Sequence, residues 1–524
     1  MFVAATMEDV MTQAPTRDGM TELSHRRSVA AGLGGPERVQ RQHERGLMTA
    51  LERAEMLLDP GTRIPFGPLV HSGVPGEEDR TMGDGMLIGF GQIDGRWVGY
   101  EASDATIKGA SGGAGSARRR RAFHRVMEEA GLPMFGLMQG GGARITDIVT
   151  SRFAGFHGPS VGDRLAFPRR GAHLIAVLGN YYGPGPTIDG DYRVMTAPSN
   201  FSVSSPPIVE EATGEKVSAF DLGGAAVHSK ITGEIDAVVP DDEAAIAQLR
   251  RVFSYFPANA WEEPPVVRTG DPWDRTEEAL RDLIPARASR VYDVKKAIKA
   301  VVDRDSYIEW MPDFAKQLTC GIARLDGHSV GIIANQPGVR AGSLDVDSGT
   351  KVRRILQICE FMRLPLVSFI DVPGVLPTVE EEHRRLQDAV WGLGIDRVRL
   401  PQPKLSVILR KAYGFAIFAM SGADPEWYSY AWPSAQIAFV GPEPGVRVSY
   451  RKQWQAAEDK DAFVAKYAEQ IRLDSEPWNG AKLDFLDDVI DPAATRPILI
   501  KALAVARERT RNSETQRGWE RPRA

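Results

Sequence analysis

Hydrophobic and polar positions alternate most clearly in residues 85–102, GMLIGFGQIDGRWVGYEA, on both sides of Asp94 and Gly95. An Asp-Gly pair between two alternating segments is a strong short-range signal for a β-hairpin, so we predict two antiparallel strands here. A helix is expected over about residues 116–130, and the apolar run in LPMFGLMQGGGAR follows it. Apolar positions at helical spacing also predict helices within residues 37–57.

The same succession of segments occurs twice, at a spacing of about 232 residues. IDGRWVGY at 93–100 is echoed by LDGHSVGI at 325–332, and RRAFHRVMEEAGLPMFGLMQGGG is echoed by RRILQICEFMRLPLVSFIDVPGV. The third pair is HLIAVLGNYYG and LSVILRKAYGF, in which Gly183 and Gly414 lie 231 residues apart. Three echoes in almost constant register predict two homologous domains produced by internal duplication.

Each copy contains strands that alternate with a helix, which predicts an α/β fold with parallel strand pairing. Pro, Trp and charged residues cluster without periodicity near residues 256–290, which we interpret as the junction between the copies. We therefore expect a disordered tail at 1–25, an N-terminal domain at 26–265 and a C-terminal domain at 266–524.

Composition narrows the possible functions. A net charge of −5 and a pI near 6.1 argue against a nucleic-acid partner. The two cysteines, Cys320 and Cys359, provide neither a disulfide framework nor a zinc site, and they favour a reducing compartment. No window approaches the roughly 20 apolar residues of a membrane span, and no signal peptide is recognisable. We expect a cytoplasmic protein that binds no metal and no membrane.

Residues 409–420, LRKAYGFAIFAM, run from a strand-like segment through Gly414 into a helix-compatible apolar segment. The first amides of a helix have no partner within the helix, so such a turn presents hydrogen-bond donors to an anionic group. A weaker version of the same turn occurs at 178–186, LGNYYGPGP.

Several stretches in order along the chain resemble the carboxyltransferase (beta) subunits of biotin-dependent acyl-CoA carboxylases, the propionyl-CoA and acetyl-CoA carboxylase beta-chain family. These stretches are ERVQRQHERGLMTALERAEMLLDPGT, GGGARITD, TGEKVSAFDLGGAAVHSKITGEID, GHSVGIIANQP, AGSLDVDSGTKVRRIL, LVSFIDVPGVLP, LRKAYGFA and AWPSAQIAFVG. They extend over about residues 36–450, which is far more specific than a single motif.

The resemblance implies two tandem crotonase-like domains, assembled into hexamers with active sites between the N-terminal domain of one subunit and the C-terminal domain of another. It implies transfer of carboxylate from biotin to the α carbon of an acyl-CoA thioester through an enolate. Biotin would come from a partner alpha subunit that contains the biotin carboxylase and biotin carrier. Assembly as a homohexamer or with another beta-type subunit is expected.

The resemblance also assigns the oxyanion donors. The amides of Phe415 and Ala416, after Gly414, would face biotin, and the turn at Gly183 and Gly185 would face the thioester. Phe415 replaces the usual second glycine, so a bulky side chain must find room there. Pro184 replaces another glycine and has no N–H group, which removes one expected donor for the enolate unless Gly185 supplies it.

The resemblance also assigns substrate-binding residues, and for two groups of them a purely structural role is the alternative. Arg118 and Arg121, in the run 118–121, would bind the phosphates of CoA or else lie on a solvated helix face. Phe418 stands where the family sets its acyl-chain preference, so a large apolar side chain indicates an unusual substrate. The glycine-rich stretch 140–144 would line the CoA channel or form a purely structural turn; its three candidate residues are Gly141, Gly142 and Ala143.

Other features favour structural roles. Asp345 and Asp371 follow apolar segments and are expected at caps or turns rather than as residues that tune the site. No histidine falls in a hydrolase triad or metal-ligand pattern. An aromatic cluster is expected in the core or at a subunit interface rather than around a ligand; it contains Trp427, Tyr428, Tyr430 and Trp432.

Two other functions stay open at this point. The replacements at Pro184 and Phe415 suit a related acyl-thioester enzyme that works without biotin, such as a decarboxylase. The chain would alternatively be a non-catalytic structural subunit that pairs with an active homologue.

Overall fold

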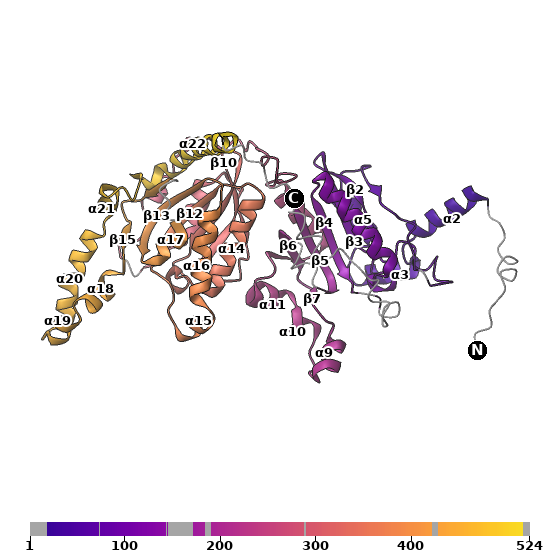
Figure 1. Cartoon of the computed structure of the whole chain (residues 1–524), viewed down its shortest axis with the longest axis horizontal. Coiled ribbons are helices and arrows are strands. Elements are labelled where there is room, and N and C mark those ends of the chain that lie inside the picture. Colours follow the sequence, from indigo (N-terminus) through magenta and orange to yellow (C-terminus); the bar gives the residue numbers. More distant parts are fainter. Residues whose placement is uncertain are drawn as a thin grey trace.

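The chain folds around two mixed β-sheets, one in each half of the sequence (Figure 1). The structure is a computed structural model that describes residues 18–72, 74–142, 144, 171–183, 190–287, 290–421 and 428–516. Within these residues each sheet contains eight strands.

The first half contains the following elements in chain order: α2 (Gly19–Ala31), α3 (Pro36–Glu44), α4 (Ala50–Leu57), β1 (Ile64–Pro65), β2 (Met86–Ile93), β3 (Arg96–Ser103), η1 (Lys108–Ala110), α5 (Ala114–Ala130), β4 (Met134–Gly140), β5 (His173–Tyr182), β6 (Tyr192–Thr196), β7 (Asn200–Ser202), α9 (Pro206–Thr213), α10 (Ala219–Gly223), α11 (Ala225–Val227), η3 (His228–Thr232), β8 (Ala237–Val239) and α12 (Asp242–Phe253).

The first sheet has the strand order β1-β2-β3-β4-β5-β6-β8, and β7 pairs with the end of β5. Strands β2 and β3 form the predicted antiparallel hairpin, with Ile93 opposite Arg96 and a turn at Asp94 and Gly95. From β3 to β6 the strands are parallel, as expected for strands that are joined by helical crossovers. The helix predicted near 116–130 is α5, and the helices predicted within 37–57 are α3 and α4.

The second half contains η4 (Glu278–Leu280), α13 (Val294–Val301), β9 (Ile308–Trp310), β10 (Leu318–Leu325), β11 (His328–Asn335), η5 (Arg340–Gly342), α14 (Val346–Phe361), β12 (Leu366–Val372), α15 (Val379–His383), α16 (Leu386–Arg399), β13 (Lys404–Tyr413), α17 (Phe415–Ser421), β14 (Ser429–Ala431), β15 (Gln436–Ala438), α18 (Pro442–Ser449), α19 (Arg451–Ala456), α20 (Lys460–Asp474), α21 (Pro477–Lys482), β16 (Asp488–Val489), η6 (Pro492–Ala494) and α22 (Thr495–Gln516).

The second sheet repeats the first. Its strand order, β9-β10-β11-β12-β13-β14-β16, matches β1-β2-β3-β4-β5-β6-β8 position by position, and β15 pairs with β13 as β7 pairs with β5. The hairpin of β10 and β11 places Leu325 opposite His328, with its turn at Asp326 and Gly327. The α/β class and the internal duplication that the sequence predicts are therefore confirmed.

The two halves pack against each other through buried side chains. Tyr192 of β6 lies with its ring centroid 5.0 Å from that of Trp310 in β9, and both residues are fully buried. The backbone N–H of Met311 donates to the carbonyl of Asp236 over 2.8 Å. One hydrophobic core accordingly contains residues from both sheets.

The predicted boundaries are only partly covered by the described residues. Residues 1–17 lie outside them, and Gly19 begins α2, so the described end of the predicted disordered tail is helical. Within the described part of the chain, no helix or strand occurs between α12 and η4, where the sequence predicts the junction. The division at 265 and 266 stays a prediction. None of the described helices combines the length and apolar character needed to cross a membrane.

Candidate functional site

The turn at Gly414 joins the carboxyl end of β13 directly to α17. Gly414 has a φ of 62°, and a Cβ atom at this position would lie 3.0 Å from the carbonyl oxygen of Phe439. Its own N–H donates to the carbonyl of Ala438 in β15 over 3.0 Å. Positive φ and a close backbone neighbour together explain why glycine is needed here.

Two backbone donors follow this glycine and find no acceptor among the described residues. The N–H of Ile417 bonds back to the carbonyl of Gly414 over 3.2 Å, but no described residue accepts a hydrogen bond from Phe415 N–H or Ala416 N–H. Ala416 is fully buried and Phe415 is half-buried. Because buried amides nearly always have a partner, this pair marks a place for an acceptor that the described chain does not supply.

The bulky side chain of Phe415 lies against the neighbouring helix. Its ring centroid is 4.1 Å from that of Trp391 in α16 and 6.2 Å from that of Phe418. Trp391 is 56% exposed and Phe418 is 42% exposed, so these rings form an open aromatic ledge beside the turn. The ledge is where Phe415 finds room, and the predicted role of Phe418 in acyl-chain preference stays a prediction.

The corresponding turn in the first half uses its glycine differently from the sequence expectation. Gly183 follows β5 with a φ of 136°, and its N–H donates to the carbonyl of Ser202 in β7 over 2.9 Å. That amide is thus used in strand pairing, as the N–H of Gly414 is. Pro184 and Gly185 lie outside the described residues, so their predicted roles stay predictions.

The glycine-rich stretch predicted to line the CoA channel lies beside this first turn. Gly141 has a φ of 98°, and a Cβ atom at this position would lie 3.1 Å from the ring of Tyr181. Its N–H donates to the carbonyl of Gly109, and the carbonyl of Gly142 accepts from the N–H of Gly112. The fold therefore brings Gly141 and Gly142 to the carboxyl end of β5. Ala143 lies outside the described residues.

The four arginines at 118–121 separate into different environments on α5. Arg119 is buried and donates to the carbonyls of Gly67, Gly83 and Met86, so its role is structural. Arg120 pairs with buried Glu101 over 2.9 Å. Arg118 is exposed and pairs with no described residue, and Arg121 is half-buried. Of the two predicted phosphate ligands, Arg118 is the one that is open to solvent.

A buried ion pair that sequence reasoning missed lies on the strand that leads to Gly414. Arg410 Nε donates to Asp371 Oδ2 over 3.0 Å, and the N–H of Lys411 donates to Asp371 Oδ1 over 3.1 Å. Asp371 is fully buried in β12, so the predicted cap or turn role is wrong for this residue. The signal available in the sequence was an arginine within the apolar run of β13.

The surroundings of this ion pair are also polar. Burial, together with the charge and hydrogen bond of Asp371, raises the pKa of Tyr292 well above its ordinary value. The guanidinium of Arg410 lies 5.1 Å from the ring centre of Tyr292. The pair thereby ties β12 to β13 immediately before the turn and fixes the strand that leads to the amides of Phe415 and Ala416.

The other predicted structural residues behave as expected where they are described. Asp345 caps α14, with its side chain accepting from the N–H of Ser348. Tyr430 and Trp432 are buried in the second core, while Trp427 lies outside the described residues.

The described residues contain no group of three His, Cys, Asp or Glu side chains arranged to hold a metal ion. Both cysteines are buried and unpaired, and burial raises the pKa of each thiol to about 12.

Comparisons with known proteins agree with this geometry. Residues 41–519 match the carboxyl transferase domain family. The chain is 36% identical to methylmalonyl-CoA decarboxylase subunit alpha of Veillonella parvula, over 94% of this chain and 96% of that one. It is 35% identical to the methylmalonyl-CoA carboxyltransferase 12S subunit of Propionibacterium freudenreichii, over 94% of each chain.

A further sequence relative and a solved structure also match this chain. The carboxyltransferase subunit of propionyl-CoA carboxylase from Haloferax mediterranei is 34% identical over 94% of this chain and 97% of that one. The crystal structure of transcarboxylase 12S with methylmalonyl-coenzyme A bound superposes with a TM-score of 0.88 at 32% identity, covering 95% of this chain and 97% of that one. The protein is therefore a member of the carboxyl transferase domain family with its two-domain crotonase-like fold.

Proposed function

We propose that this chain is the carboxyltransferase subunit of a biotin-dependent acyl-CoA carboxylase or transcarboxylase. Its substrate would be a short acyl-CoA, since the names of its relatives refer to propionyl-CoA and methylmalonyl-CoA. The observation that carries the proposal is that the amides of Phe415 and Ala416, after Gly414, have no acceptor among the described residues, in a chain of this family. Biotin, brought by a partner protein, supplies the carboxylate group.

The residues of this chain would act mainly by placing hydrogen-bond donors. When an α proton leaves an acyl thioester, negative charge moves to the thioester oxygen. In the same reaction, negative charge also develops on the ureido oxygen of biotin. Fixed amides that already point at such an oxygen stabilise the transition state, at about 3 to 4 kcal/mol for each donor. The amides of Phe415 and Ala416 would donate to the ureido oxygen of biotin, as the resemblance to the family implies.

The acyl-CoA side of the proposal depends on residues around β5. Gly141 and Gly142 lie beside Tyr182 and would line the approach to the Gly183 turn, and the exposed Arg118 on α5 would suit a CoA phosphate. The N–H of Gly183 is engaged with Ser202, so a donor for the enolate has to come from a residue after it in the chain.

Assembly and partners form part of the same proposal. Gly183 and Gly414 follow strands of different sheets. Because the resemblance to the family implies active sites between the domains of two subunits, we infer a site completed by a second subunit. The transcarboxylase 12S relative is described as a hexamer assembly, which supports a hexamer here. A separate biotin carrier, with or without a biotin carboxylase, would be the partner, and the complex would be cytoplasmic.

The purified chain tests the proposal directly. We would incubate it with methylmalonyl-CoA and free biotin and follow the appearance of propionyl-CoA. Malonyl-CoA as substrate and acetyl-CoA as product form the alternative pair. Biotin-dependent turnover that Gly414→Ala lowers by about a hundredfold or more and that Gly394→Ala preserves would support the proposal. Gly394 is a matched control because a Cβ atom there would meet no atom within 4 Å.

A second candidate function is decarboxylation. It is favoured by the relative named as a methylmalonyl-CoA decarboxylase subunit and by Pro184, which lacks an amide donor. Turnover of methylmalonyl-CoA without biotin would favour a biotin-independent decarboxylase. If the chain showed no turnover yet bound a second beta-type chain stably, a structural subunit would be favoured instead.

A further inference from the structure

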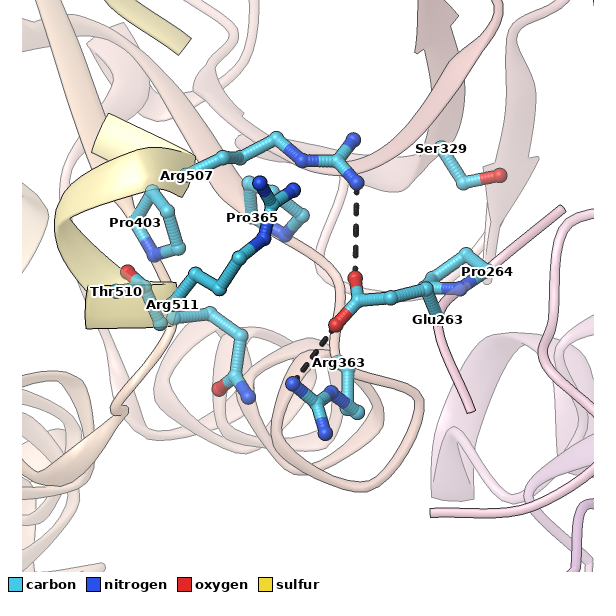
Figure 2. Close-up of a pocket in the computed structure, with 10 residues that line it drawn as sticks. Glu263, Pro264, Ser329, Arg363, Pro365, Pro403, Arg507, Thr510 and Arg511 are labelled. Carbon is cyan, nitrogen blue, oxygen red and sulfur yellow. Dashed lines mark ion pairs between the residues drawn. The ribbon is translucent and has the colours of Figure 1, made fainter. Parts of the chain in front are cut away.

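A small cavity lies at the edge of the second sheet where β11, β12 and β13 begin, which is the edge opposite to the Gly414 turn. Figure 2 shows the side chains that line it. Ser329 is near the start of β11, and Pro365 and Pro403 immediately precede β12 and β13. The linker residue Glu263 and the helix α22 close the cavity. Because β13 is ten residues long and Gly414 follows its other end, roughly 30 Å of strand separates this cavity from the turn.

Positive charge exceeds negative charge among the side chains that line the cavity. Arg363 pairs with Glu263 over 2.8 Å, and Arg507 lies 3.6 Å from the other oxygen of the same carboxylate. Figure 2 shows Glu263 between these two guanidinium groups. Arg511 also lines the cavity and pairs with Glu508 on its own helix. Glu263 is thus the lone carboxylate among the described lining residues, against three guanidinium groups.

Arg507 is held in place by a neutral neighbour. Its guanidinium donates to Nδ1 of His328. Burial, with the charges of Arg507 and Arg268, lowers the pKa of His328 to about 4, so the imidazole accepts this hydrogen bond at neutral pH without adding charge. Burial also lowers the pKa of Arg507, and the guanidinium groups of Arg511 and Arg363 contribute to the lowering while Glu263 opposes it. An anion here would relieve that repulsion.

Two buried polar groups at the cavity have no partner among the described residues. The hydroxyl of Ser329 and the Oε1 atom of Gln402 each lack a hydrogen bond, although these residues are only 3% and 8% exposed. Buried polar groups of this kind normally have a hydrogen-bond partner, so a ligand that supplies one would explain both groups. A serine hydroxyl can donate to an anion, and a rotated glutamine amide can do the same.

We propose that this cavity is a binding site for a small tetrahedral oxyanion, such as phosphate or the terminal phosphate of a phosphomonoester. Arg507 and Arg363 supply the charge, and Ser329 and Gln402 supply neutral donors. The cavity holds about 50 Å³, the room of roughly four water molecules, which suits one phosphate group but not a nucleotide. A bound anion would join the segments before β12 and β13 to β11 and α22, and it would compete with Glu263 for the guanidinium groups of Arg363 and Arg507.

Inorganic phosphate is the probe for the test. We would measure the melting temperature of the full chain against phosphate concentration, with chloride at equal ionic strength as the reference. The wild-type protein should show a saturable rise. Arg507→Gln should weaken the apparent affinity about tenfold or more, because a charged hydrogen-bond donor is lost. Glu263→Gln should strengthen it, because a competing carboxylate is removed.

Matched variants separate this site from others. Arg509→Gln removes an exposed charge from the same helix and should leave phosphate binding unchanged. Arg118→Gln, at the proposed CoA site, should also leave it unchanged. Glycerol phosphate in place of phosphate distinguishes a phosphomonoester ligand from free phosphate. No saturable rise, an unchanged response in Arg507→Gln or Glu263→Gln, or loss of the response in Arg118→Gln would overturn the proposal.

Discussion

Arg354 of α14 donates two hydrogen bonds to the buried carboxylate of Asp236, from Nε over 2.8 Å and from Nη2 over 2.7 Å. Asp236 lies just before β8 in the first half, whereas Arg354 belongs to the second half. Opposite charge outweighs burial and raises the pKa of Arg354 above its ordinary value. The pair therefore helps to hold the two sheets together.

Asp236→Asn should destabilise the protein by about 3 to 5 kcal/mol, because it leaves the Arg354 guanidinium buried without a carboxylate. Urea unfolding would measure the change. Asp388→Asn breaks the exposed pair with Arg385 and is the matched control, which should have little effect. Equal changes in the free energy of unfolding for the two variants would show that the buried pair stabilises the protein no more than the exposed pair does.

Gly414→Ala should lower turnover by about a hundredfold or more. An alanine would have to adopt a φ of 62° with its Cβ 3.0 Å from the Phe439 carbonyl, so the turn must shift and carry the amides of Phe415 and Ala416 with it. Steady-state kinetics, with melting temperatures to confirm folding, would measure this. A folded variant with unchanged turnover would contradict the proposed role of the turn.

Phe418→Ala should change which acyl-CoA is preferred. Its ring is 42% exposed on the aromatic ledge beside the turn, and removing it opens space for a longer acyl chain. We expect the ratio of kcat/KM for butyryl-CoA over propionyl-CoA to rise about tenfold or more. Val398→Ala, on the exposed face of α16, is the control. A uniform change for all acyl-CoAs would place Phe418 away from the acyl chain.

Arg118→Gln should raise the KM for acyl-CoA about tenfold with kcat unchanged, since a phosphate contact contributes equally to ground and transition states. Arg125→Gln, another exposed position on α5, should leave KM as it is. If both variants behave alike, Arg118 is part of a solvated helix face, which is the plainer alternative.

The buried cluster around Glu101 should make stability depend on acid pH. Burial alone would raise the pKa of Glu101, but the charges of Arg120 and His124 and their hydrogen bonds lower it far below its ordinary value of 4.5. Above about pH 4.5 the carboxylate is charged in the folded and unfolded states, and its stabilising contribution is complete. Below that pH the unfolded chain takes up the proton first, so the contribution is lost.

Melting temperatures between about pH 6 and pH 3 would test this dependence. Glu101→Gln should lower stability at neutral pH, because Arg120 loses its partner, yet its stability should fall less steeply with acid than that of the wild type. Glu129→Gln, at an exposed position of α5, the helix that contains Arg120 and His124, should keep the wild-type slope. Identical slopes in all three proteins would refute the linkage to Glu101.

The amino-acid sequence by itself determined the duplicated α/β architecture and the turn at Gly414. Both depend on local patterns: alternation around Asp94 and Asp326, helical spacing in α5, and a glycine between a strand and a helix. Such patterns reflect backbone preferences and the periodicity of burial, which act over a few residues and can be read along the chain.

The tertiary structure decided which residues are available for chemistry. It buried Arg119 and paired Arg120 with Glu101 while leaving Arg118 exposed, and it engaged the amide of Gly183 with Ser202. It also paired Arg410 with Asp371 across two strands. These outcomes depend on contacts between residues far apart in the chain, and a charged group changes its role when burial forces it to find a partner. No local pattern carries that information.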